Sequence, residues 1–112
     1  MGARETPIQS AILELLQWKG VFAWRCQAIP VPIRRGNQIV GLRAANEETL
    51  GIPDILGCHK GRLFGIEVKS AKGVLSDGQK RWRDNILKAG GAWTCARSTE
   101  EAEQFLKETF GV

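Results

Sequence analysis

Two acidic residues and a lysine in the second half of the chain have the types and spacing that metal-assisted hydrolysis requires. Asp54 precedes Glu67 and Lys69 by 13 and 15 residues. Because side chains alternate between the faces of a strand, Glu67 and Lys69 share one face of a strand Arg62–Lys69. The Lys60-Gly61 pair favours a tight hairpin turn, and the strand ends furthest from that turn meet. The sequence therefore predicts that Asp54 lies opposite Glu67.

Two carboxylates about 4 Å apart repel each other unless a cation neutralises them, and Mg²⁺ is the natural occupant of such an oxygen-rich site. The carbonyl oxygen of Val68 is a further predicted ligand. Lys69 would orient the attacking water and donate to the scissile phosphate, which predicts phosphodiester hydrolysis. The structural alternatives are a turn residue after Pro53 for Asp54 and a solvated strand end for Lys69.

The first half of the chain must position this group. Apolar spacing predicts a helix over Thr6–Lys19, with Thr6 and Gln9 as a capping box and Pro7 in the first turn. A strand is expected over Val21–Ala28, closed by prolines at positions 30 and 32. The segment Ile29–Gly51 is the least periodic, with a possible edge strand at Asn37–Arg43.

The second half is more regular. The runs Asp54–Gly57 and Arg62–Lys69 are expected to pair as an antiparallel hairpin. Ser76 and Gln79 form a capping box that opens a helix ending at Gly90-Gly91, and Ser98 with Glu101 opens a last helix. The strand at 92–97 would lie parallel to its predecessor after a right-handed crossover. The fold class is therefore α/β with a mixed sheet flanked by helices.

Composition fits one domain spanning residues 1–112. The chain has 16 Lys+Arg against 12 Asp+Glu, a net charge of +4, and 43% hydrophobic residues. No apolar run is long enough to span a bilayer and no leader is evident, so a soluble, cytoplasmic protein with no membrane association is expected. Three widely spaced cysteines argue for reduced thiols, and a zinc site lacks ligand pairs.

The acidic residues and the motifs around them resemble those of a known protein family. Gly51-Ile52-Pro53-Asp54 followed by Glu67-Val68-Lys69 resembles the PD-(D/E)xK nuclease signature. The string Gly51–Arg97, which includes Ser76-Asp77-Gly78-Gln79-Lys80 and Ala89-Gly90-Gly91, resembles the virus-type replication-repair nuclease (VRR-NUC) domain. The resemblance covers the second half closely and the first helix loosely.

The resemblance implies a restriction-endonuclease-like αβββαβ core that cuts DNA with Mg²⁺, or with Mn²⁺ in its place, and uses no nucleotide cofactor. It also implies a first-helix glutamate near the metal, for which Glu5 is the candidate and Gln9 the fallback, and it gives Gln79 a part in positioning water or phosphate. Stand-alone members of this size resemble homodimers that cleave Holliday junctions, which suggests a phage or bacterial source, whereas domains ending long eukaryotic proteins belong to flap nucleases.

Basic residues could form a phosphate-binding surface outside the acidic group. The candidates are Arg34, Arg35, Lys60, Arg62, Lys72 and Lys80. The four tryptophans fall mostly on apolar faces, which favours core packing over base stacking. His59 is expected in an exposed turn, away from the acids.

The sequence is also compatible with two functions other than that of an enzyme. One is a catalytically silent module that holds DNA for a partner. The other is a metal-stabilised subunit of a larger replication or repair complex.

Overall fold

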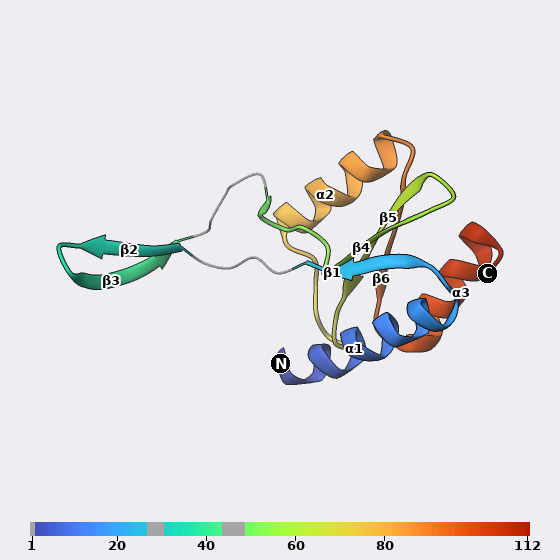
Figure 1. Cartoon of the computed structure of the whole chain (residues 1–112), viewed down its shortest axis with the longest axis horizontal. Helices are drawn as coiled ribbons and strands as arrows, with labels where there is room; N and C mark the ends of the chain where they lie inside the picture. Colours follow the sequence, from blue (N-terminus) through green and yellow to red (C-terminus); the bar gives the residue numbers. More distant parts are fainter. Residues whose placement is uncertain (1, 27–30, 44–48) are drawn as a thin grey trace.

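The computed structural model describes residues 2–26, 31–43 and 49–112, with side chains from residue 5 onward. Along the described residues, one helix precedes five successive strands, and a helix, a strand and a last helix follow (Figure 1). Their bounds are α1 Gly2–Trp18, β1 Phe22–Arg25, β2 Val31–Arg35, β3 Gln38–Arg43, β4 Ile55–His59, β5 Arg62–Val68, α2 Asp77–Lys88, β6 Ala92–Ala96 and α3 Thr99–Phe110.

The main sheet has four strands in the order β1-β4-β5-β6. Strands β1, β4 and β5 pair antiparallel, and β6 lies parallel to β5. The β4–β5 turn has positive φ at Lys60 (51°) and Gly61 (80°), which suits a tight hairpin. Helix α2 connects the two parallel strands β5 and β6. The predicted mixed α/β sheet is confirmed.

Alternation along β5 divides the molecule into layers. Phe64, Ile66 and Val68 are buried in a core shared with α1 and α3. Gly65 faces the other way, because a Cβ there would lie 3.1 Å from Cδ1 of Ile86 on α2. Figure 1 shows α2 on one side of the sheet and α1 and α3 on the other. Glu67 follows the alternation of Gly65 and therefore belongs to the α2 side.

The first helix begins earlier than the sequence predicts. Helix α1 already includes Gly2, so Thr6 is not its N-cap and the predicted Thr6–Gln9 capping box is wrong. Pro7 lies inside the helix, where its missing N–H costs one hydrogen bond to the carbonyl of residue 3. Residues such as Ala, Arg and Glu favour helix, which explains an added turn before the proline.

The segment expected to be irregular contains a hairpin. Strand β3 matches the predicted strand closely, but it pairs with β2 in a separate two-stranded sheet. This ribbon stands apart from the main sheet (Figure 1). Pro32 was expected to end a strand, yet it lies within β2, because a two-stranded ribbon leaves one side of each strand unpaired. The predicted end of the preceding strand, at residues 27 and 28, and Pro30 lie outside the described residues.

The caps of the last two helices mostly follow prediction. Ser76 and Gln79 form a reciprocal capping box at α2. At α3, Oγ of Ser98 accepts from the Glu101 N–H, but the Glu101 carboxylate accepts from the N–H of Arg97, one residue before the expected partner. The α3 cap is therefore half of the predicted box.

Two predictions about aromatic rings are wrong. Trp18 and Trp24 are 90% and 41% exposed, so neither is part of the core. His59 ends strand β4 and is half-buried against Phe110 with ring centroids 5.4 Å apart, whereas an exposed loop position was expected. Among the described helices, none has the length and apolar character needed to cross a membrane.

Candidate metal-dependent active site

The hairpin places the two predicted acids opposite each other. Ile55 pairs with Ile66 in the register of β4 and β5, so the preceding residue, Asp54, faces Glu67. The backbone of Asp54 is still tied to the sheet, because its carbonyl oxygen accepts from the N–H of Cys26 at 2.8 Å. The predicted convergence of the two carboxyl groups at this strand end is therefore present.

The Asp54 side chain completes the end of the sheet. The next position along the ladder would pair Val68 with Pro53, and a proline has no N–H to donate to the Val68 carbonyl. The N–H of Val68 donates to Oδ2 of Asp54 at 2.8 Å. One carboxylate oxygen of Asp54 thus completes the end of the sheet. The carbonyl of Val68 lies beside the acids in the chain, and its role as a ligand stays a prediction.

Gln79 links the acids to α2. Its backbone N–H donates to Oγ of Ser76, and its Oε1 accepts from the Ser76 N–H at 2.9 Å. Its Nε2 donates to Oε1 of Glu67 at 3.2 Å. The predicted cap is present, and the same side chain also contacts Glu67, because its amide has a donor and an acceptor end. The part of Gln79 in positioning water or phosphate stays a prediction.

A close backbone approach brings α2 to this position. Gly51 has φ of 84°, and a Cβ on it would lie 2.1 Å from the carbonyl carbon of Gly78. A Cβ on Gly78 would in turn lie 3.1 Å from the carbonyl oxygen of Leu50. Only glycine at position 51 allows the loop before Asp54 to touch the first turn of α2. This contact sets the distance from Gln79 to the acids.

Glu67 is the most perturbed acid in the site. It is only 2% exposed. Burial, together with the hydrogen bond and negative charge of Asp54, raises its pKa to about 9, while the charge of Lys69 opposes the rise. Its Oε2 is buried, and no group among the described residues donates a hydrogen bond to it. Glu67 is therefore a buried acid whose charge Lys69 compensates only in part.

These features fit a small divalent cation. Glu67 offers an unpartnered oxygen next to a second carboxylate, which is the hard donor set that Mg²⁺ prefers. Among the described residues, no three His, Cys, Asp or Glu side chains gather closely enough to hold an ion alone. Mg²⁺ commonly binds one or two carboxylates together with water and phosphate oxygens. Asp54 and Glu67 therefore offer as many protein carboxylates as such a site uses.

Glu5 lies in the first turn of α1 and is half-buried. Its charge contributes the smallest of the effects that raise the pKa of Glu67, so it faces the same region. It does not complete a three-carboxylate group with Asp54 and Glu67. Its role as a metal ligand stays a prediction, as does that of Gln9, the half-buried alternative one turn further along α1.

Comparisons with known proteins agree with this geometry. No family model matches the chain, and no curated protein sequence matches it either. A solved structure titled "VRR_NUC domain" superposes with a TM-score of 0.63 over 96% of this chain and 97% of that one, at 17% sequence identity. The chain has the VRR_NUC fold. The resemblance inferred from the Pro53-Asp54 and Glu67-Val68-Lys69 motifs is thus confirmed for the fold.

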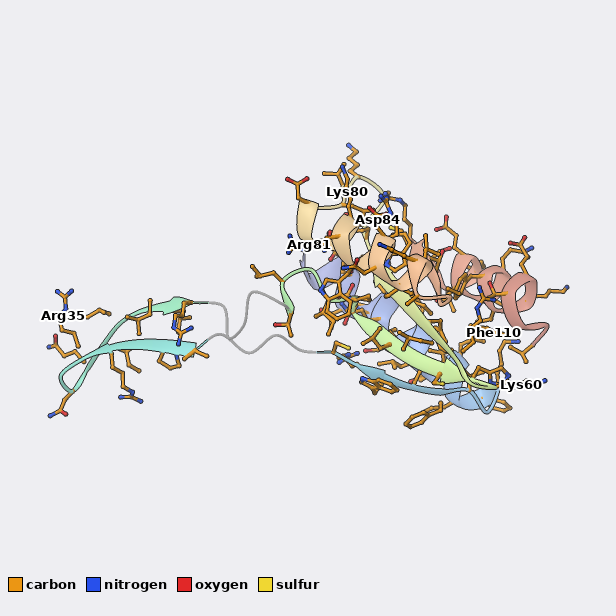
Figure 2. All side chains as sticks on the ribbon, turned by 90° about the horizontal axis from the view of Figure 1, so that it is seen from above. Arg35, Lys60, Lys80, Arg81, Asp84 and Phe110 are labelled. Carbon is orange, nitrogen blue, oxygen red and sulfur yellow. The ribbon has the colours of Figure 1, made fainter. Side chains whose placement is uncertain are left out.

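Within this VRR_NUC fold, the predicted phosphate contacts occupy separate places. Figure 2 shows Arg35 on the β2–β3 ribbon and Lys60 at the opposite end of the molecule, with Lys80 on α2 between them. Arg34 neighbours Arg35 on the ribbon, and Lys72 is exposed in the loop between β5 and α2. Lys72 and Lys80 follow Lys69 and Gln79 closely in the chain.

Arg62 has a structural role in addition to the predicted one. Its Nε donates to the carbonyl oxygen of Gly90 at 3.1 Å, and its guanidinium lies 6.0 Å from the centre of the Phe110 ring. These contacts tie the β4–β5 hairpin to the end of α2 and to α3. Any contact of Arg62 with phosphate stays a prediction.

Two cysteines flank the acids, a proximity that their wide spacing in the sequence does not predict. The N–H of Cys26 bonds to Asp54, and Cys95 is the register partner of Glu67 on β6. Burial raises the pKa of both thiols, and the charge of Glu67 adds to it. The predicted strand pairing could have revealed Cys95, because it follows from the parallel alignment of β5 and β6.

Proposed function

We propose that this protein is a Mg²⁺-dependent deoxyribonuclease, with Mn²⁺ able to substitute, that hydrolyses phosphodiester bonds in branched DNA as a homodimer. The observation that carries the proposal is the pairing of half-buried Asp54 with buried Glu67, which has an unpartnered carboxylate oxygen. The VRR_NUC fold of a solved structure supports it.

Each side chain has a distinct part in this proposal. Asp54 and Glu67 would hold the ion, with the Val68 carbonyl as a further oxygen ligand. The bound ion would supply charge stabilisation at the phosphoryl oxygens and a water of lowered pKa. Gln79 holds Glu67 in place by donating a hydrogen bond from its Nε2 to Oε1 of Glu67. Lys69, which is half-buried and close enough for its charge to act on Glu67, would orient the water and donate to the phosphate.

The basic surface would read DNA shape rather than sequence. Lys72 and Lys80 would contact the backbone beside the site, because contacts to phosphates position a protein without specifying bases. A net charge of +4 is modest for one domain, and a dimer would double it. This is why we propose a branched substrate and a second copy of the chain.

The test is a panel of labelled junction, flap, single-stranded and duplex DNAs incubated with Mg²⁺, Mn²⁺ or a chelator. We expect metal-dependent cleavage of branched DNA and none with chelator. Lys69→Ala and Asp54→Asn should abolish cleavage while folding and DNA binding persist. The asparagine retains an oxygen that can accept from Val68, so it is the conservative change. Exposed Lys107, on α3, provides the control Lys107→Ala, which should still cut.

A variant at Lys69 or Asp54 with normal turnover would refute the assignment of these residues. A wild-type protein that binds branched DNA but never cuts it would indicate the silent DNA-binding module instead. Sedimentation of the free protein would show whether it is a dimer.

A further inference from the structure

Two aromatic side chains are exposed together on the edge strand β1. Phe22 is 69% and Trp24 41% exposed, and their ring centroids are 5.2 Å apart with a tilt of 48°. We call Phe22 and Trp24 the aromatic pair. Exposed aromatic rings are costly to leave in water, so a pair of them on one edge requires an explanation.

The aromatic pair lies on the same sheet face as the acids. Ala23 packs against the core and Arg25 donates to Oγ of Ser10 on α1, so these two residues face α1. Alternation along the strand then turns Phe22 and Trp24 to the opposite face. That is the face of α2, to which Glu67 also belongs.

The register fixes how far the aromatic pair lies from the acids. Trp24 is the partner of Leu56, two residues from Asp54, and Phe22 is the partner of Cys58. At about 3.3 Å per residue, these levels lie about 7 and 13 Å along the strand from Asp54. Stacked nucleotides repeat about every 3.4 Å along one strand of DNA. The pair therefore begins about two nucleotides from the carboxylates, and exposed Lys60 lies beyond it, in the turn that follows the neighbouring strand β4.

We propose that Phe22 and Trp24 form a stacking platform for unpaired nucleobases of the DNA strand that is cut at Asp54 and Glu67. This inference rests on the proposed nuclease function. Aromatic faces bind unpaired bases in a sequence-tolerant way, whereas paired bases in a duplex keep their faces covered. The platform would select substrates with a single-stranded segment next to the scissile bond.

The area of the pair favours a base over a second copy of the chain. An aromatic side chain buries about 150 to 250 Å² at most, so two fall well short of the roughly 800 Å² per partner of a stable interface. A positive charge at the far end, from Lys60, suits a phosphate that follows the stacked bases.

The experiment compares Trp24→Leu with the matched control Trp18→Leu, both in chelator so that no cleavage occurs. Trp18 is more exposed and has no ring contact with the aromatic pair among the described residues. Anisotropy would measure binding of a labelled oligothymidine and of a duplex of equal length. We expect Trp24→Leu to weaken oligothymidine binding about 5- to 150-fold, the range for one stacked base, with duplex binding unchanged. Trp18→Leu should bind like the wild type, and Trp24→Phe should restore most of the affinity.

The platform is overturned if Trp24→Leu binds oligothymidine normally, if it loses affinity for single strand and duplex equally, or if the wild type does not bind oligothymidine. It is also overturned if Trp24→Leu converts a dimer of free protein to a monomer, because a second copy then covers the pair. A wild type that shows the expected binding but never cuts with Mg²⁺ or Mn²⁺ supports the platform while refuting the nuclease.

Discussion

Replacing Glu67 with glutamine is expected to stabilise the metal-free protein at neutral pH. The folded protein keeps a proton on Glu67 because burial and Asp54 raise its pKa to about 9. Glutamine has the same shape as the protonated acid, can still accept from Gln79 and can donate to Asp54. The change therefore removes the cost of protonation and leaves the local contacts in place.

The sign and size follow from linkage. Between pH 4.5 and about 9, the unfolded chain has lost the proton that folded Glu67 retains. Folding must take up a proton in this window, so stability falls as pH rises through it, and the loss ends near the folded pKa. From 4.5 to pH 7, at about 1.4 kcal/mol per pH unit, Glu67 destabilises the metal-free fold by about 3 kcal/mol.

Urea unfolding in chelator at pH 5 and pH 8 measures this effect. We expect the wild type to lose stability relative to Glu67→Gln as the pH rises, and added Mg²⁺ to stabilise the wild type more than the variant. Glu14→Gln, at an exposed position on α1, is the matched control and should follow the wild type. Parallel pH profiles for wild type and Glu67→Gln in chelator would refute the reasoning.

Three further experiments test the residues around Glu67: a substitution of Gln79, a pair of glycine substitutions, and the labelling of two cysteines. Gln79→Ala should lower the free energy of unfolding by about 1 to 3 kcal/mol, because it leaves a buried acid oxygen and a cap N–H unpaired, and a cost near zero in urea unfolding would contradict this. Gly51→Ala should cost about 3 kcal/mol or more, because a Cβ there overlaps the start of α2 at positive φ. Gly36→Ala, also at positive φ but with open space around it, should cost only about 1 kcal/mol, and equal melting temperatures for the two would rule out the overlap. Cys26 and Cys95 should react with iodoacetamide more slowly than free cysteine at pH 7, because their raised pKa values leave less thiolate, and rapid labelling of either would show that the site is open.

Local sequence signals predicted the elements that carry the site. The Lys60-Gly61 turn fixed the β4–β5 hairpin and hence the meeting of Asp54 with Glu67, because turn geometry sets register over a few residues. Ser76 and Gln79 gave the start of α2 for the same reason, since a capping box depends on residues three apart. The β2–β3 ribbon was only half predicted, because Pro32 would mark a strand end in a central sheet but not in an isolated ribbon.

The chain by itself determined which residues meet along neighbouring strands, since alternation and tight turns act locally. Only the tertiary structure decided how those residues are solvated. Glu67 becomes a buried acid because α2 and the sheet enclose it, and Trp24 becomes exposed because β1 is an edge strand that α2 does not cover. Burial depends on packing between elements that are distant in sequence, so no local pattern specifies the charge state of one residue or the exposure of the other.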